Sequence, residues 1–176
     1  AFVSPNIVIS QFYGGGGNVA GSPHTHDFVE LFNRGDQPVS LNGWSTQYAS
    51  ASGSNWLVTP LGNITLQPGQ YYLIQYATGG ANGSALPTPD LIAPQVTVGM
   101  NTFVPNLSGT SGKIALVNST QQLPASACPV SSSIIDLVGY GASAACFEGT
   151  RAADLSNTTA AKRNSSGCTD TDNNSS

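Results

Sequence analysis

The chain has 176 residues, enough for one domain with a hydrophobic core, and only 8% of them are charged, against about 25% in an average domain. The net charge of −4 and the scattered basic residues exclude a surface that tracks nucleic-acid phosphates. No apolar run approaches the roughly 20 residues that span a bilayer, so no membrane insertion is expected. Hydrophobic residues make up 39% of the chain, which argues against disorder.

Short apolar runs separated by turn residues recur along the chain. Residues 6–13, NIVISQFY, alternate as a half-buried strand does. In residues 26–49 an apolar run ends at the turn residues NRGD, and Trp44 is predicted to anchor the core because its ring buries the most apolar area. Further strands are predicted at residues 56–58, 71–76, 96–98, 113–118 and 134–138. Recurrent Gly, Pro, Ser and Thr disfavour helix, and periodicity fades after residue 150, which predicts a polar coil wrapped around the strands.

Several sequence strings resemble the lamin tail domain, in the form found in secreted bacterial proteins. They are FVELFNRGDQPVSLNGWSTQYAS from residue 28, TLQPGQYYLIQ from 65, KIALVNS from 113, DLVGYG from 136, CFEG from 146, SNTTAAKR from 156 and GCTDTDNN from 167. The resemblance implies an all-β, immunoglobulin-like antiparallel β-sandwich, formed as one domain over residues 1–176 with a polar C-terminal tail from about 150. It also implies an accessory module without catalytic activity.

The two ends of the chain suggest how it is processed and assembled. A start at Ala1 rather than Met is expected of a secreted chain after signal cleavage, although a trimmed chain would look the same. Proteins of the resembling family continue past TDTDNN into a further apolar segment, so a sheet-edge segment is expected to be missing here. An open edge accepts a strand from another copy, and residues 1–10, AFVSPNIVIS, are the predicted donor.

Three cysteines leave one thiol without an intramolecular partner. The predicted disulfide joins Cys128 and Cys146, because these residues flank the apolar strand at 134–138, and closing such a loop is worth about 3 kcal/mol. Cys168 lies in the polar tail and is the predicted odd thiol. A zinc site is the alternative, but the chain has no Cys-x-x-Cys pair.

The tail also contains part of a calcium-loop pattern. Asp170, Asp172 and Asn174 have the spacing of its first three ligands, so these residues are the candidate calcium ligands. The pattern then fails, because Ser175 stands where the loop requires glycine and no bidentate glutamate follows. The alternative is a solvated polar tail.

No set of residues forms a convincing catalytic site. His24 and His26 would share one face of a strand and reach one metal, but the alternative is two loop histidines. The only glutamates are Glu30, for which a structural hydrogen bond is expected, and Glu148. The glycines at 14–17 lack the Gly-Lys-Ser/Thr ending of a phosphate loop. The chain is therefore not expected to be an enzyme.

Glycosylation sequons are frequent in this Ser/Thr-rich chain. Asn82 and Asn106 lie in segments that read as exposed loops, so they are the preferred acceptors if the source glycosylates proteins.

Three functions remain open from the sequence. The first is a non-catalytic extracellular module for binding or adhesion at the cell surface, with a surface protein, a glycan or copies of itself as partner. The second is a structural subunit of a fibre or surface layer assembled by strand donation. The third is a metal-dependent enzyme using the histidine pair. No cofactor is expected, and calcium is the one ion that the residue pattern favours.

Overall fold

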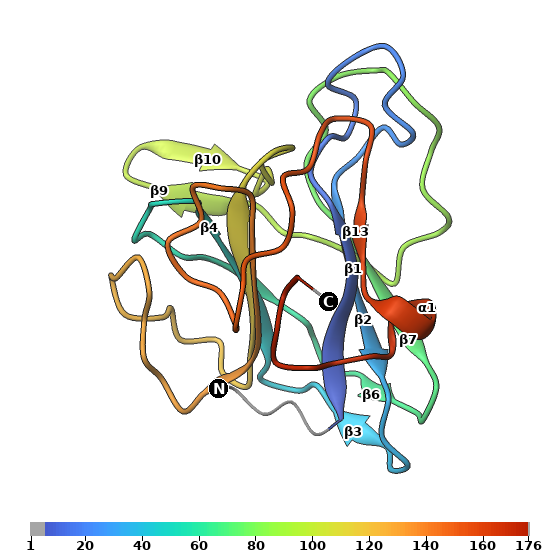
Figure 1. The fold of residues 1–176 in the computed structure, drawn as a ribbon, viewed down its shortest axis with the longest axis vertical. Coiled ribbons are helices and arrows are strands. Elements are labelled where there is room, and N and C mark those ends of the chain that lie inside the picture. The colour runs from blue at the N-terminus through green and yellow to red at the C-terminus, as the bar shows by residue number, and fades with distance from the viewer. Residues whose placement is uncertain (1–5, 176) are drawn as a thin grey trace.

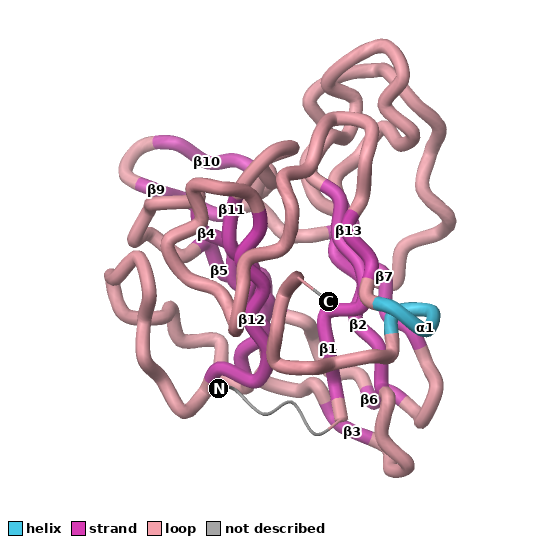
Figure 2. Tube along the Cα trace, in the orientation of Figure 1, coloured by secondary structure: helices cyan, strands magenta, loops and turns pink. Residues whose placement is uncertain are grey.

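Two β-sheets face each other and enclose the main hydrophobic core (Figures 1 and 2). The structure is a computed structural model that describes residues 6–175. The first sheet has the order β13 (Ala161–Lys162), β1 (Ile7–Tyr13), β2 (Phe28–Asn33), β7 (Tyr71–Gln75) and β8 (Leu91–Ile92). The second has the order β12 (Ile134–Tyr140), β11 (Gly112–Val117), β4 (Ser45–Ser50) and β5 (Leu57–Pro60). All neighbours except β7 and β8 are antiparallel, so the predicted immunoglobulin-like β-sandwich is confirmed.

Two small two-stranded sheets lie outside the two main sheets. β3 (Val39–Ser40) pairs with β6 (Thr65–Leu66), and β9 (Val96–Val98) forms a separate hairpin with β10 (Asn101–Phe103). The four-residue α1 (Asn164–Gly167) contains Ser165 and Ser166 at φ 52° and 60°, so it is a left-handed turn and not a regular α-helix. The described chain therefore contains no regular helix, as its composition predicts.

The main core comes from alternate residues of the facing strands. Ile9, Leu31 and Ile74 point inward from the first sheet, and Ile114 and Leu116 meet them from the second. Each fully buried side chain of this kind contributes about 2 kcal/mol of transfer free energy. The period-2 pattern that predicts strands in the sequence is the pattern that builds this core.

A second hydrophobic cluster covers the outer face of the β11–β4 sheet. Trp56 is its largest member and is fully buried under the loop at residues 118–133, where its indole N–H donates to the Ser126 carbonyl at 3.0 Å. The prediction that Trp44 anchors the core is wrong, because Trp44 is only half-buried at the margin of the main cluster. It lies in the turn before β4, whereas the outer face of the sheet encloses Trp56.

A disulfide fixes the loop at residues 118–133 to the segment after β12. Cys128 and Cys146 are bonded, with sulfur atoms 2.04 Å apart, as the sequence analysis predicted. Cys168 is free and half-buried. The second cluster is thus closed by a covalent bond as well as by packing.

The first strand pairs with β2 on one side and, at Gln11 and Phe12, with β13 on the other. β1 lies between β2 and β13, so Ile7 to Ser10 of the predicted donor segment are already in a sheet. Residues 1–5 of that segment lie outside the described residues. The edge of β12 is covered by the tail, because Asn174 Oδ1 accepts the Gly139 N–H at 2.9 Å and Asn174 Nδ2 donates to the Leu137 carbonyl at 2.9 Å. The chain's own tail therefore occupies the edge of β12 at these two residues.

Candidate functional site

An irregularity in β1 opens this strand to side chains from distant segments. The pairing register with β2 shifts between Ile9 and Gln11, which leaves Ser10 as a bulge. The Ile9 N–H donates to Asp136 Oδ2 at 2.7 Å, and the Ile9 carbonyl accepts Arg163 Nε at 2.9 Å. The bulge therefore brings β12 and the tail together at one point.

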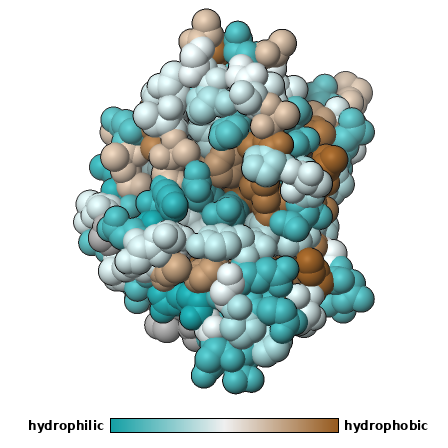
Figure 3. Space-filling view, turned by 90° about the vertical axis from the view of Figure 1, so that its right-hand side faces the viewer, coloured by the Kyte–Doolittle hydropathy of each residue, from teal (hydrophilic) through white to brown (hydrophobic). Residues whose placement is uncertain are grey.

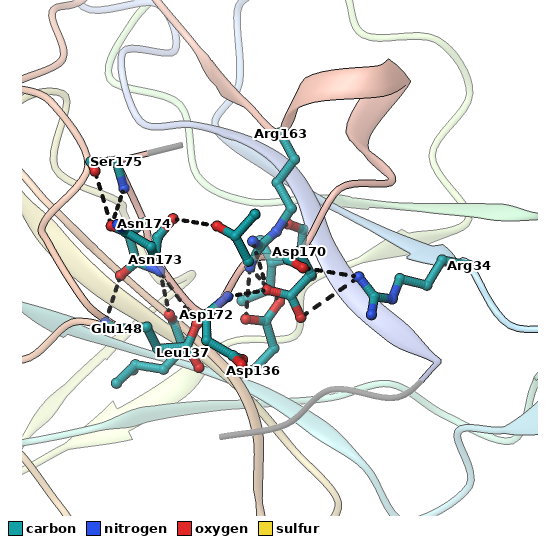
Figure 4. Close-up of polar contacts among 12 residues, drawn as sticks. Arg34, Asp136, Leu137, Glu148, Arg163, Asp170, Asp172, Asn173, Asn174 and Ser175 are labelled. Carbon is teal, nitrogen blue, oxygen red and sulfur yellow. Dashed lines mark hydrogen bonds and ion pairs between the residues drawn. The ribbon is translucent and has the colours of Figure 1, made fainter. Parts of the chain in front are cut away.

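Asp136 and Arg163 form a buried ion pair at this point (Figure 4). Arg163 Nη2 lies 2.8 and 3.0 Å from the two carboxylate oxygens of Asp136. Burial raises the pKa of Asp136, and the opposing charge of Arg163 limits that rise. Arg163 Nη1 also donates to Asp170 Oδ1 at 3.1 Å, so one guanidinium connects two carboxylates.

Three further carboxylate oxygens converge next to the ion pair. Glu148, Asp170 and Asp172 each place an oxygen within 4.8 Å of the other two, and no other group of three such metal-ligating residues occurs in residues 6–175. We call these three residues the carboxylate cluster. Glu148 is only 4% exposed, and its Oε1 has no hydrogen-bond partner among the described residues. Burial, with the nearby charges of Asp136 and Asp170, raises the pKa of Glu148 to about 8.

The predicted calcium ligands are only partly brought together. Asp170 and Asp172 belong to the carboxylate cluster, but Asn174 does not, because its Oδ1 accepts the backbone N–H groups of Gly139 and Glu148. Glu148 takes the third position from a segment 22 residues before Asp170. Gly149 permits this approach, since a Cβ at that position would lie 2.9 Å from Asn173 Cγ.

A groove runs between the edge strand β5 and the β9–β10 hairpin. It consists of two adjoining hollows of about 420 and 290 Å³, which share Asn55, Leu57 and Val98. The remaining lining residues are Tyr48, Ala49, Ser50, Trp56, Val58, Val96, Thr97, Gly99, Asn101, Phe103, Thr120 and Gln122. No charged residue lines either hollow. We call this feature the uncharged groove.

The uncharged groove combines amide, hydroxyl and apolar groups. Phe103 is 36% exposed at its rim, and Met100 at the tip of the hairpin is fully exposed. Gln122 Nε2 donates to Asn55 Oδ1 at 2.8 Å and to the Trp56 carbonyl at 2.8 Å, which orients both amides. The sequence did not predict this groove. The only sequence feature that points to it is the pair of apolar residues, Val98 and Met100, on either side of Gly99.

Exposed apolar residues also occur on the side of β7. Figure 3 shows the face that lies to the right in Figure 1, the side of β7, where hydrophobic side chains cross the middle of a largely hydrophilic surface. Ile92 of the neighbouring edge strand β8 is 63% exposed. A single exposed apolar residue is ordinary on a protein surface, so Ile92 alone does not indicate a binding site.

The two histidines do not form a metal site with a third ligand. The His24 ring packs edge-on against Tyr13 and Phe28, with centroids 6.0 and 5.8 Å apart. His26 Nδ1 forms a hydrogen bond with Thr25 Oγ1 at 2.9 Å. Neither histidine belongs to a group of three metal-ligating residues in the described chain.

The remaining candidates have structural surroundings. Glu30 accepts a hydrogen bond from Ser10 Oγ at 2.7 Å across the bulge. The glycine loop at 14–17 passes close to another backbone segment, since a Cβ on Gly16 would overlap the backbone of His26. Asn82 is exposed but its Nδ2 donates to the Gly17 carbonyl at 3.0 Å, whereas Asn106 is an exposed loop residue.

Residues 6–175 contain no helix with the length and hydrophobicity that a membrane crossing requires.

Comparison with known proteins assigns the family. The family model described as Lamin Tail Domain matches residues 1–142, and a search of curated proteins found no significant match. Asp136 lies inside the matched span, while the carboxylate cluster lies beyond it. Because the match covers most of the chain and the fold is a β-sandwich, the chain belongs to the lamin tail domain family, a family of non-catalytic immunoglobulin-like modules.

Proposed function

We propose that the chain is a non-catalytic extracellular module that binds a neutral glycan at the cell surface, with the uncharged groove as its binding face. The observation that carries this proposal is the chemistry of the groove. In a chain with 14 charged residues, none lines either hollow. A charged partner would find no counter-charge there, so the lining favours an uncharged ligand.

The polar groups of the groove suit sugar hydroxyls. The amides of Asn55 and Gln122 are fixed by their mutual hydrogen bond, and ordered polar groups bind a ligand with less loss of side-chain entropy. The exposed ring of Phe103 provides an apolar surface for the C–H face of a sugar ring. The two adjoining hollows, of about 420 and 290 Å³, have room for more than one sugar unit.

The extracellular location rests on two observations. The Cys128–Cys146 disulfide is typical of proteins from oxidising compartments, and the surface carries few charges. Assembly by strand donation has no specific observation in its favour, because Ile7 to Ile9 of the donor segment are already paired with β2.

The test is binding of the purified chain to an array of neutral polysaccharides, followed by calorimetry on each ligand found. We expect Phe103→Ala to weaken binding about tenfold or more, since loss of an exposed aromatic contact costs on the order of 1–2 kcal/mol. Phe147→Ala is the matched control, because Phe147 is 38% exposed but lies outside the groove.

Two results would contradict the proposal. One is that no neutral glycan binds while an acidic one does. The other is that Phe103→Ala and Phe147→Ala bind the glycan equally well.

A further inference from the structure

We propose that Glu148, Asp170 and Asp172 bind a calcium ion, and that this ion holds the C-terminal tail against β12. The three carboxylates come from two segments, the loop after β12 and the tail. A shared ion would therefore connect these segments. The proposal does not depend on the glycan-binding role of the groove.

The charges of the side chains around the carboxylate cluster favour a bound cation. Four carboxylates, those of Asp136 and the carboxylate cluster, face only two guanidinium groups, Arg163 and Arg34. With all four carboxyl groups ionised, as they would be around a bound ion, four negative charges and two positive charges leave −2. Arg34 Nη1 stands 4.0 Å from Asp170 Oδ2, a weak and partly exposed contact. One divalent ion would neutralise the remaining charge.

Glu148 is the second, independent sign of a ligand. The residue is only 4% exposed, and its Oε1 has no hydrogen-bond partner in the described chain, although Asn174 Nδ2 approaches Oε2 at 3.4 Å. A buried carboxylate oxygen without a donor costs several kcal/mol of desolvation, so such oxygens are normally paired or bound to metal. Figure 4 shows Glu148 near Asp172 and Asn174.

The geometry and ligand type favour calcium. All ligands are hard oxygens, and their mutual separation of up to 4.8 Å is about twice a calcium–oxygen bond. Calcium accepts six to eight oxygens in flexible arrangements, so backbone carbonyls and water can complete the shell, whereas magnesium gives up its water reluctantly.

The tail is the element that the ion would stabilise. Asn174 covers the edge of β12 through Gly139 and Leu137, and its own N–H donates to the Glu148 carbonyl at 3.0 Å. These contacts pack the cluster carboxylates together, and repulsion between those carboxylates opposes the packing. An ion bound between them removes the repulsion and adds bonds across the same contact.

The experiment is calcium titration of the full chain after treatment with a chelator, followed by calorimetry and thermal unfolding. We expect one ion per chain, a dissociation constant of roughly 10⁻⁵–10⁻³ M and a rise in Tm that follows the calcium concentration. Glu148→Gln and Asp172→Asn should each weaken binding at least about tenfold. Asp36→Asn is the matched control, because Asp36 is exposed and outside the cluster.

A further readout separates ion binding from a structural role. Without calcium, Glu148→Gln should be at least as stable as the wild type, since it replaces a buried carboxyl group, and calcium should no longer raise its Tm. The proposal is overturned if calcium at about 5 mM gives the wild type neither heat nor a Tm rise. It is also overturned if magnesium raises Tm equally, or if Glu148→Gln and Asp172→Asn retain wild-type affinity.

Discussion

Asp27 shows how one buried carboxyl group can connect three segments. Its Oδ1 accepts the Gly16 N–H at 2.8 Å, and its Oδ2 accepts the Leu107 N–H at 2.9 Å. Asp27 itself stands just before β2, so it joins the glycine loop, this strand and the segment after β10. Burial raises the pKa of Asp27 to about 7, although both hydrogen bonds favour the ionised form.

This raised pKa predicts a loss of stability with rising pH. A group whose pKa is higher in the folded chain stabilises the fold while protonated, and that contribution disappears as pH rises through the folded pKa. From a pKa of about 7, the contribution of Asp27 falls by roughly 3 kcal/mol between about pH 5 and pH 8. Urea unfolding at both pH values should show a smaller decline for Asp27→Asn than for the wild type.

Asp36→Asn is the control for this comparison, because Asp36 is exposed and its replacement should leave the pH profile unchanged. Part of the decline will remain in Asp27→Asn, because Asp136 and Glu148 also have raised pKa values. Identical profiles for Asp27→Asn and the wild type would mean that Asp27 is already ionised at about pH 5.

Residue spacing predicted part of the carboxylate cluster and missed the rest for a physical reason. Asp170 and Asp172 are two positions apart, so their proximity is local and visible in the sequence. Glu148 reaches them only because the tail folds back past Gly149. Asn174 continues the two-residue spacing of Asp170 and Asp172. Its side chain instead forms hydrogen bonds with the backbone of β12, so it does not join the carboxylate cluster.

Among the elements, the loop at residues 118–133 acts as a third layer on the sandwich. It covers the second hydrophobic cluster, where Lys113 Nζ is held by the carbonyls of Gly53 and Ala127 at 2.7 Å and lies 5.2 Å from the centroid of the Trp56 ring. The disulfide closes this layer.

Removal of the disulfide should therefore weaken the whole fold. Replacing both Cys128 and Cys146 by Ser should lower the free energy of unfolding by about 3 kcal/mol, because the unfolded chain loses its crosslink. The matched control is Cys168→Ser, which removes the free thiol and should change stability little. Denaturant unfolding of the double variant, of Cys168→Ser and of the wild type measures these differences. If the double variant were as stable as the wild type, packing alone would hold the loop.

The strength of the local pattern decides which elements the sequence predicts. β1, β7 and β12 have five to seven residues with clear apolar alternation or β-branched and aromatic side chains, and the sequence predicts all three. β8 and β13 have two residues each, too few for any periodicity, and pairing with a neighbour defines them. The sequence places Trp56 in a predicted strand but does not identify it as a core anchor, because a sheet buried on both faces does not alternate cleanly.

At the scale of the whole molecule, we expect a monomer from the character of the sheet edges. β13 and β8 are very short edge strands, and β5 ends at Pro60, which has no N–H to donate. These are features that discourage pairing between molecules.

Light scattering of the native, unreduced protein should give a mass near 18.0 kDa, both with and without calcium. A dimer that disappears on reduction, and in Cys168→Ser, would identify a crosslink through the free thiol. Large polymers that persist on reduction would contradict the monomer and revive strand donation, with residues 1–5 as the segment to delete.

The two-sided pairing of β1 has a consequence for how the chain is made. Ile9 receives its last partner from Arg163, 154 positions later. Contacts so distant in sequence form slowly, because the entropy cost of closing a long loop comes before the contact can stabilise the chain. During synthesis, β1 and β2 can pair early. The other edge of β1 has no strand to pair with until residues 161–163 emerge from the ribosome. That interval is when a nascent chain is most exposed to pairing with the wrong strand.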